Sequence, residues 1–135
     1  MIESLKSVFT EIDEALSGIN VALTKRYDVL TKMIDVVKAY AKHEKETLFE
    51  VIKLRDDMSI KERNEANRAM DENIKKINIV AENYPELKSS ENYKTLQKSI
   101  ADVEEHLQAA RRLYNSKVSS YNQLIVSFPT SCIAK

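Results

Sequence analysis

The sequence predicts an all-α protein of one domain, residues 1–135, folded as an up-and-down four-helix bundle. The chain contains one Gly, two Pro and no Trp, which leaves little turn material for sheets and hairpins. A charged fraction of 31% beside a hydrophobic fraction of 43% is typical of amphipathic helices. Large apolar residues also recur every seven positions in both halves of the chain, as they do in helices that pack along one stripe.

The first half of the chain carries this heptad pattern over more than fifty residues. Apolar side chains dominate two positions of the repeat and form one stripe, which only Arg26, Glu44 and Thr47 interrupt. The first position holds Leu5, Ile12, Ile19, Arg26, Met33, Tyr40, Thr47 and Leu54, and the second holds Phe9, Leu16, Leu23, Leu30, Val37, Glu44 and Val51.

The architecture depends on whether this stripe belongs to one helix or two. A helix over residues 3–54 would be about 75 Å long, and the next helix could cover only half of it. Another subunit would then have to cover the stripe over residues 5–23. We therefore expect a turn between Lys25 and Thr31, where Asp28 can cap a new helix and the charge of Arg26 interrupts the stripe. The unbroken heptad phase favours the alternative, three long helices with a continuous first helix.

Start and stop signals place the remaining helices. Ser59 stands three residues before Glu62, which is the spacing of a capping box, and Pro85 disfavours helical geometry in the residue before it. We expect a helix over residues 60–84 between these signals. Its inward residues should be Met70, Ile74, Ile77 and Ala81.

Ser89 or Ser90 should cap the last helix, and Pro129 should end it. Aromatic and aliphatic residues recur along this helix every seven residues. They are Tyr93, Ile100, Leu107, Tyr114, Tyr121 and Phe128, flanked by Leu96, Val103, Ala110 and Leu124.

The composition argues against several classes of function. Lys plus Arg equals Asp plus Glu, 21 each, so no strong positive field favours nucleic acid. Cys132 is the single cysteine, which excludes an internal disulfide and a Cys-rich zinc site. No run of about 18 apolar residues is present to span a bilayer. Residues 118–134 nevertheless carry no charge, and we expect them to pack on the start of the first helix or to lie near a bilayer surface.

Six groups of residues carry a resemblance to a known family. They are KRYD at 25–28, YAKHEKETL at 40–48, YPELK at 84–88 followed by EN at 91–92, ARR at 110–112 with YN at 114–115, YN at 121–122 and FP at 128–129. In their order and spacing, which span nearly the whole chain, they resemble the LemA family of bacterial proteins. The resemblance implies a helical bundle behind an N-terminal membrane anchor, without an established enzymatic activity. A relative takes part in building magnetosome membranes.

The chain departs from the family pattern at two places. Thr31 stands where the family usually has Pro, a residue suited to the first turn of a helix, which supports a break nearby. The expected membrane anchor is missing, either because the sequence was trimmed after it or because this member is soluble. The resemblance implies a membrane-associated, non-enzymatic scaffold or adaptor with an unidentified protein partner and no nucleic acid.

No candidate catalytic, cofactor or metal site emerges from the motifs. His43 and Glu44 lack the second His of a helical His-Glu-x-x-His motif, because Thr47 occupies that place. Arg26, Arg111 and Arg112 are candidates for binding phosphate or lipid headgroups, although an Arg beside a seam more often pairs with a carboxylate. The residues expected to have structural or interaction roles are Arg26, Asp28, His43, Glu44, Glu104, Arg111, Asn115 and Asn122.

Two carboxylates at or beside core positions require partners, because buried ions are costly unless they are paired. Glu44 lies in the stripe and Glu104 flanks the core of the last helix. The simplest interpretation is a polar layer that fixes helix register, and we expect Arg111 to contact Glu104 or Glu50. The alternative to a scaffold is a metal-binding or enzymatic bundle that uses Glu44 and Glu104.

Overall fold

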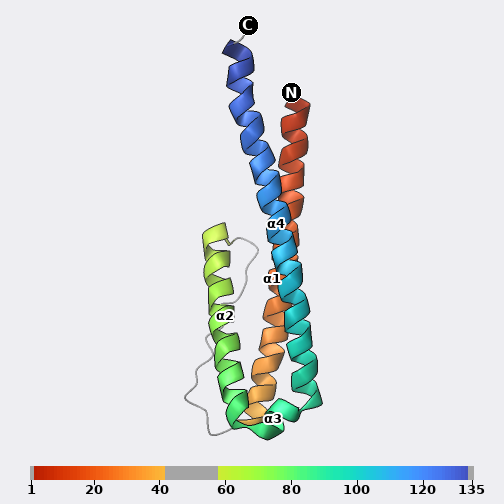
Figure 1. Ribbon diagram of the computed structural model, residues 1–135, viewed down its shortest axis with the longest axis vertical. Coiled ribbons are helices and arrows are strands. Elements are labelled where there is room, and N and C mark those ends of the chain that lie inside the picture. Colours follow the sequence, from red (N-terminus) through yellow and green to blue (C-terminus); the bar gives the residue numbers. More distant parts are fainter. Residues whose placement is uncertain (1, 42–57, 134–135) are drawn as a thin grey trace. The chain divides into compact units, whose positions relative to one another are not determined.

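The computed structural model describes residues 2–41 and 58–133, and over this part of the chain the all-α prediction is confirmed (Figure 1). Four helices and no strand are present among these residues. They are α1 (Ile2–Tyr40), α2 (Ile60–Asn83), α3 (Pro85–Ser89) and α4 (Glu91–Ile133).

The predicted turn between Lys25 and Thr31 is wrong, because α1 is helical through this segment. Asp28 is therefore an exposed residue inside α1 and does not cap a helix. The charge of Arg26 does not interrupt the helix, because neighbouring helices provide its partners. Thr31 keeps the backbone amide that a proline lacks, and its Oγ1 donates to the Tyr27 carbonyl at 2.9 Å within the helix. The structure therefore has the continuous first helix of the alternative prediction, as far as Tyr40.

The predicted signals at both ends of α2 are confirmed. The Glu62 amide donates to the Ser59 Oγ at 3.1 Å, and the Ser59 amide donates to the Glu62 carboxylate at 3.3 Å. These two bonds form the capping box at the start of α2. At its other end, Tyr84 has a non-helical backbone, and Pro85 begins the short helix α3.

Helix α4 begins where predicted and ends later than predicted. The Tyr93 amide donates to the Ser90 Oγ at 3.4 Å, which makes Ser90 the capping residue. Helix α4 continues past Pro129 to Ile133, so the prediction that Pro129 ends it is wrong. A proline removes a single amide donor, and only four residues of α4 follow Pro129. The proline therefore disrupts few backbone hydrogen bonds of the helix.

The chain divides into two compact units, which are described separately below. Unit 2 contains Leu23–Glu104, so it includes the end of α1, all of α2 and α3, and the start of α4. Its core takes the predicted seam residues from three helices, and each of these residues is almost fully buried. They include Leu30, Met33 and Val37 of α1, Met70, Ile77 and Ala81 of α2, and Tyr93 and Ile100 of α4.

Unit 1 contains Met1–Ala22 and Glu105–Lys135, so its described part has only α1 and α4, which run antiparallel. The Phe9 and Tyr121 rings lie 4.8 Å apart, and the Lys117 ammonium lies 3.3 Å from the Glu11 carboxylate. The two helices approach closely where α1 has small residues, since the position of a Cβ on Gly18 lies 3.9 Å from the Ala110 Cβ. Helix α4 thus covers part of the stripe that the sequence analysis left uncovered.

Candidate functional site

The most distinctive polar feature of unit 2 is a buried arginine held by two other helices. Arg26 occupies a seam position of α1 and is 3% exposed. Helix α2 contributes Asn67 and Asp71, which are four residues apart and therefore share one face of that helix. Helix α4 contributes Glu104. We call these four residues the Arg26 cluster.

The guanidinium uses both of its terminal nitrogens. Its Nη1 donates to the Asn67 side-chain oxygen and, at 3.4 Å, to the Asn67 carbonyl. Its Nη2 donates to the carboxylates of Asp71 and Glu104, the latter at 2.9 Å. The Nε hydrogen has no acceptor among the described residues. One cation thus links three helices through one amide and two carboxylates.

This arrangement is suited to fixing the register of the three helices. The fork of the guanidinium matches several acceptors at once, so sliding any of the helices would break charge-assisted bonds. The carboxylates of Asp71 and Glu104 are about half exposed, and water reaches them on the outside of the bundle. The Arg26 cluster contains no thiol, hydroxyl or imidazole that could act as a nucleophile or a proton shuttle.

Sequence reasoning placed Arg26 and Glu104 among the candidates but missed Asn67 and Asp71. Asn67 is buried and follows the core residue Ala66 in the sequence. A polar residue next to a core residue is equally common on an exposed helix face, so the sequence pattern does not predict that Asn67 is buried. Only the identity of its neighbour in space explains its burial. The i, i+4 spacing of Asn67 and Asp71 was the one available signal, and it is common on exposed helix faces.

Among the other predicted residues that the structure describes, only Glu104 forms an ion pair with Arg26. Glu104 makes its ion pair with Arg26, so the predicted pair with Arg111 is not formed. Arg111 is half-buried in α4 and makes no ion pair with any described residue. Asn115 and Asn122 are exposed on α4.

Three of the predicted residues, His43, Glu44 and Glu50, lie outside the described part of the chain, as do the side chains of Phe128 and Ile133. Over residues 2–41 and 58–133 no group of three His, Cys, Asp or Glu side chains could hold a metal ion. Over the same ranges no helix combines the length and hydropathy needed to cross a membrane.

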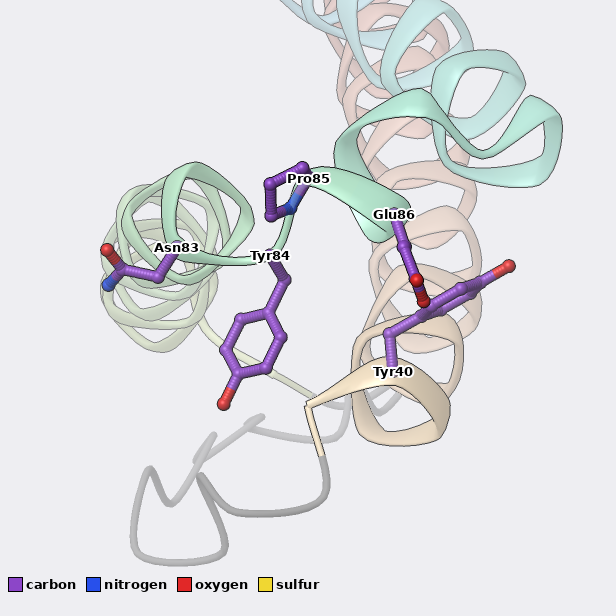
Figure 2. Close-up of a pocket in the computed structure, with 5 residues that line it drawn as sticks. All are labelled: Tyr40, Asn83, Tyr84, Pro85 and Glu86. Atoms are coloured by element: carbon purple, nitrogen blue, oxygen red, sulfur yellow. The ribbon is translucent and has the colours of Figure 1, made fainter.

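A small cavity lies at the end of unit 2 where α1 finishes and α3 begins (Figure 2). It has a volume of about 310 Å³ and is lined by Tyr40, Asn83, Tyr84, Pro85 and Glu86. Figure 2 shows the Tyr84 ring extending into the space between α1 and α2. Two of the segments that carry the family resemblance, 40–48 and 84–88, therefore each contribute to this cavity. Its lining offers two phenol rings and one carboxylate.

A buried tyrosine anchors the start of α4 in unit 2. The Tyr93 hydroxyl donates to the Asn78 side chain at 3.2 Å and accepts from the Gln97 amide at 3.0 Å. Burial raises the pKa of the Tyr93 phenol above its ordinary value of 10.0, and the negative charge of Glu82 adds to this effect, while the bond from Gln97 opposes it. Tyr93 is thus held as a neutral phenol that joins α4 to α2.

The apolar seam is covered to different degrees in the two units. In unit 2 the α1 seam residues Leu23, Leu30 and Val37 are almost fully buried. In unit 1, Phe9 at the same heptad position is 51% exposed, and Leu16 is half-buried. On the α4 side of unit 1, Ile125 is 43% exposed and Tyr114 and Tyr121 are half-buried, whereas Leu107 is 2% exposed. We call this partly covered surface the open seam, and it consists of Phe9, Leu16, Tyr114, Tyr121 and Ile125.

Comparison with known proteins gives a consistent result. The model of the LemA family matches residues 15–135 of the chain. Protein LemA of Metamycoplasma hominis is 32% identical over 130 residues, an alignment that covers 93% of this chain and 59% of that protein. The chain thus spans 59% of the length of this curated relative.

Proposed function

This chain belongs to the LemA family, and from that premise we propose that it is a non-enzymatic, membrane-associated scaffold that binds a protein partner along the open seam. The observation that carries the proposal is the exposure of large apolar side chains in unit 1. Phe9 is 51% exposed at a heptad position that Leu30 and Val37 occupy as buried residues of unit 2, and Ile125 is 43% exposed. The Phe9 ring lies 4.8 Å from the Tyr121 ring, and exposed apolar patches are typical of protein interaction sites.

The chemistry of the open seam favours a helical partner. Phe9 and Leu16 of α1 are seven residues apart, as are Tyr114 and Tyr121 of the antiparallel α4, so the apolar face of an amphipathic helix can pack against both helices. Tyr114 and Tyr121 combine a large apolar ring with a polar tip, a combination that is enriched at protein interfaces. The Arg26 cluster of unit 2, by contrast, has its charges paired within that unit.

Photo-crosslinking in cells tests the proposal. A photoreactive phenylalanine analogue at position 9 or 125 of the full-length protein should form covalent adducts of discrete mass with a protein. Ile79, 65% exposed on α2 of unit 2, is the matched control position and should form none. Adducts from position 79 alone, or from none of the three positions, would argue against the open seam as a binding surface.

Metal analysis tests the non-enzymatic part of the proposal. The alternative is a metal-binding or enzymatic bundle that uses Glu44 and Glu104, and Glu104 already pairs with Arg26. Stoichiometric iron, manganese or zinc in the purified protein would contradict the scaffold proposal and favour this alternative.

A further inference from the structure

Resting on the proposed scaffold function, we propose that the partner of the open seam is unit 1 of a second copy of this chain. The two copies would pack face to face about a twofold axis, with α1 of each copy beside α4 of the other. Each copy contributes two helices, so the product is a four-helix bundle built from two identical pairs.

The first argument comes from the way the same stripe is buried in unit 2. There a third helix, α2, packs on α1 and α4, and the seam residues Leu23, Leu30 and Tyr93 are 2% exposed or less. Among the described residues of unit 1 only α1 and α4 are present, and Leu16, Tyr114 and Tyr121 are only partly buried. Two amphipathic helices alone cannot bury a stripe of this width, since each needs partners on more than one side.

The second argument is the distribution of charge, which makes this surface complementary to itself. The α1 segment of unit 1 is acidic, because Glu3, Glu11, Asp13 and Glu14 outnumber Lys6. The α4 segment is basic, because its charged residues after Glu105 are Arg111, Arg112 and Lys117. Within one chain this complementarity already produces the ion pair between Glu11 and Lys117. An unrelated acidic or basic partner would be attracted to one helix and repelled by the other.

The charges also select one of the two possible twofold arrangements. An axis perpendicular to the helices would place the acidic α1 segment of one copy against the acidic α1 segment of the other. An axis parallel to the helices places each α1 against α4 of the other copy instead. Every neighbouring pair of helices is then antiparallel and opposite in charge, as in an up-and-down bundle. Opposite charges at the rim of an interface favour the correct pairing and disfavour the wrong one.

Sedimentation of the full chain tests this inference directly. We expect a dimer that dissociates on dilution, whose dissociation constant rises about tenfold or more when Phe9→Ser or Ile125→Ser removes an apolar contact. The control variant Ile79→Ser removes an exposed apolar side chain from unit 2 and should leave the dissociation constant unchanged. Circular dichroism checks that each variant keeps its helices. A chain that is monomeric at every concentration, or a dimer weakened equally by the control, overturns the inference.

A mixing experiment tests the pairing of α1 with α4 even if the apolar variants fold poorly. One variant carries Asp13→Lys with Glu14→Lys, and the other carries Arg111→Glu with Arg112→Glu. Each variant alone places like charges on neighbouring helices of the two copies, so each should dimerise more weakly than the unchanged protein at low salt. An equimolar mixture restores opposite charges and should form the heterodimer. Failure of the mixture to associate better than either variant overturns the proposed arrangement.

The two proposals can fail separately. If the chain is monomeric while crosslinks from positions 9 and 125 reach a different protein, the self-association is wrong and the scaffold function stands. If the only crosslinks join two copies of the chain, both proposals are supported. A monomeric chain whose positions 9 and 125 crosslink to no protein contradicts both.

Discussion

At the scale of single residues, Arg26 occupies a core position because two other helices bring acceptors to both of its terminal nitrogens. Burying a charge without partners costs several kcal/mol, so the position of Arg26 depends on Asn67, Asp71 and Glu104 being present together. The half-exposed carboxylates remain partly hydrated, which lowers the cost of the arrangement on their side.

Two substitutions of Arg26 distinguish the contribution of its charge to stability from the contribution of its side-chain volume. Arg26→Ala should lower the free energy of unfolding by about 3 kcal/mol, because it removes the bonds to three partners and leaves a cavity in the core. Arg26→Met restores most of the apolar volume and leaves the two carboxylates to water, so it should cost clearly less. Urea denaturation measures both changes. Equal losses for the two variants would show that the hydrogen bonds, and not the filled volume, dominate.

The raised pKa of Tyr93 predicts that the free energy of unfolding decreases at high pH. Because its pKa is raised in the folded protein, its contribution to stability is fully present below about pH 10, the ordinary value, and is lost as the pH rises through the raised value. Tyr93→Phe should cost about 1 kcal/mol at pH 8, since the bond to Asn78 is lost. The variant should then lose less stability than the unchanged protein between pH 8 and pH 11. Parallel losses in urea unfolding at the two pH values would rule out Tyr93 as the titrating group.

Gly18 offers a stabilising substitution. It lies inside a long helix, its φ is not positive, and a Cβ would meet the Ala110 Cβ at 3.9 Å, an ordinary van der Waals contact. Gly18→Ala should therefore raise the free energy of unfolding by up to about 1 kcal/mol through helix propensity. Thermal unfolding measures the change. A lower melting temperature would mean that α1 and α4 pack more tightly here than this distance indicates.

At the scale of helices, the start of α2 depends on one pair of side chains. Ser59→Ala removes the acceptor for the Glu62 amide and should cost about 1 kcal/mol, whereas Ser59→Asp keeps an acceptor and should cost only a few tenths. Chemical denaturation of both variants provides the measurement. If both variants were equally destabilised, the side-chain cap would not be the cause.

Local signals in the sequence predicted the ends of α2 and the start of α4, because Ser59, Pro85 and Ser90 act on the backbone next to them. The apolar spacing correctly predicted burial of Met70, Ile77 and Ala81 in α2 and of Tyr93, Ile100 and Leu107 in α4, whereas Ile74, Tyr114 and Tyr121 are only partly buried. The turn near Arg26 was predicted wrongly. A charged residue at a seam position indicates a helix break only when no other helix provides hydrogen-bond partners for its side chain. Those partners, Asn67 and Asp71, lie about 40 residues away in the sequence and form no local motif with it.

At the scale of the whole molecule, the uncharged end of α4 provides a test of membrane association. Ile125 and Val126 are 43% and 71% exposed near this end. If the segment contacts lipid headgroups, the chain should sediment weakly with phospholipid vesicles. The double variant Ile125→Ser with Val126→Ser should lose that binding and keep its helicity by circular dichroism. Absence of any vesicle binding by the unchanged chain would leave protein packing as the role of these side chains.

Unit 1 is built from two segments that are far apart in the sequence, and this affects the order in which the two units can fold. Of its two segments, Met1–Ala22 is synthesised before unit 2 and Glu105–Lys135 after it. At the usual speed of translation, on the order of ten seconds separate their appearance. Unit 2 is continuous in sequence and can begin to form during that interval. Phe9 and Leu16, however, have no partner helix until their part of α4 has been synthesised. During this interval the nascent chain exposes apolar side chains, to which chaperones can bind.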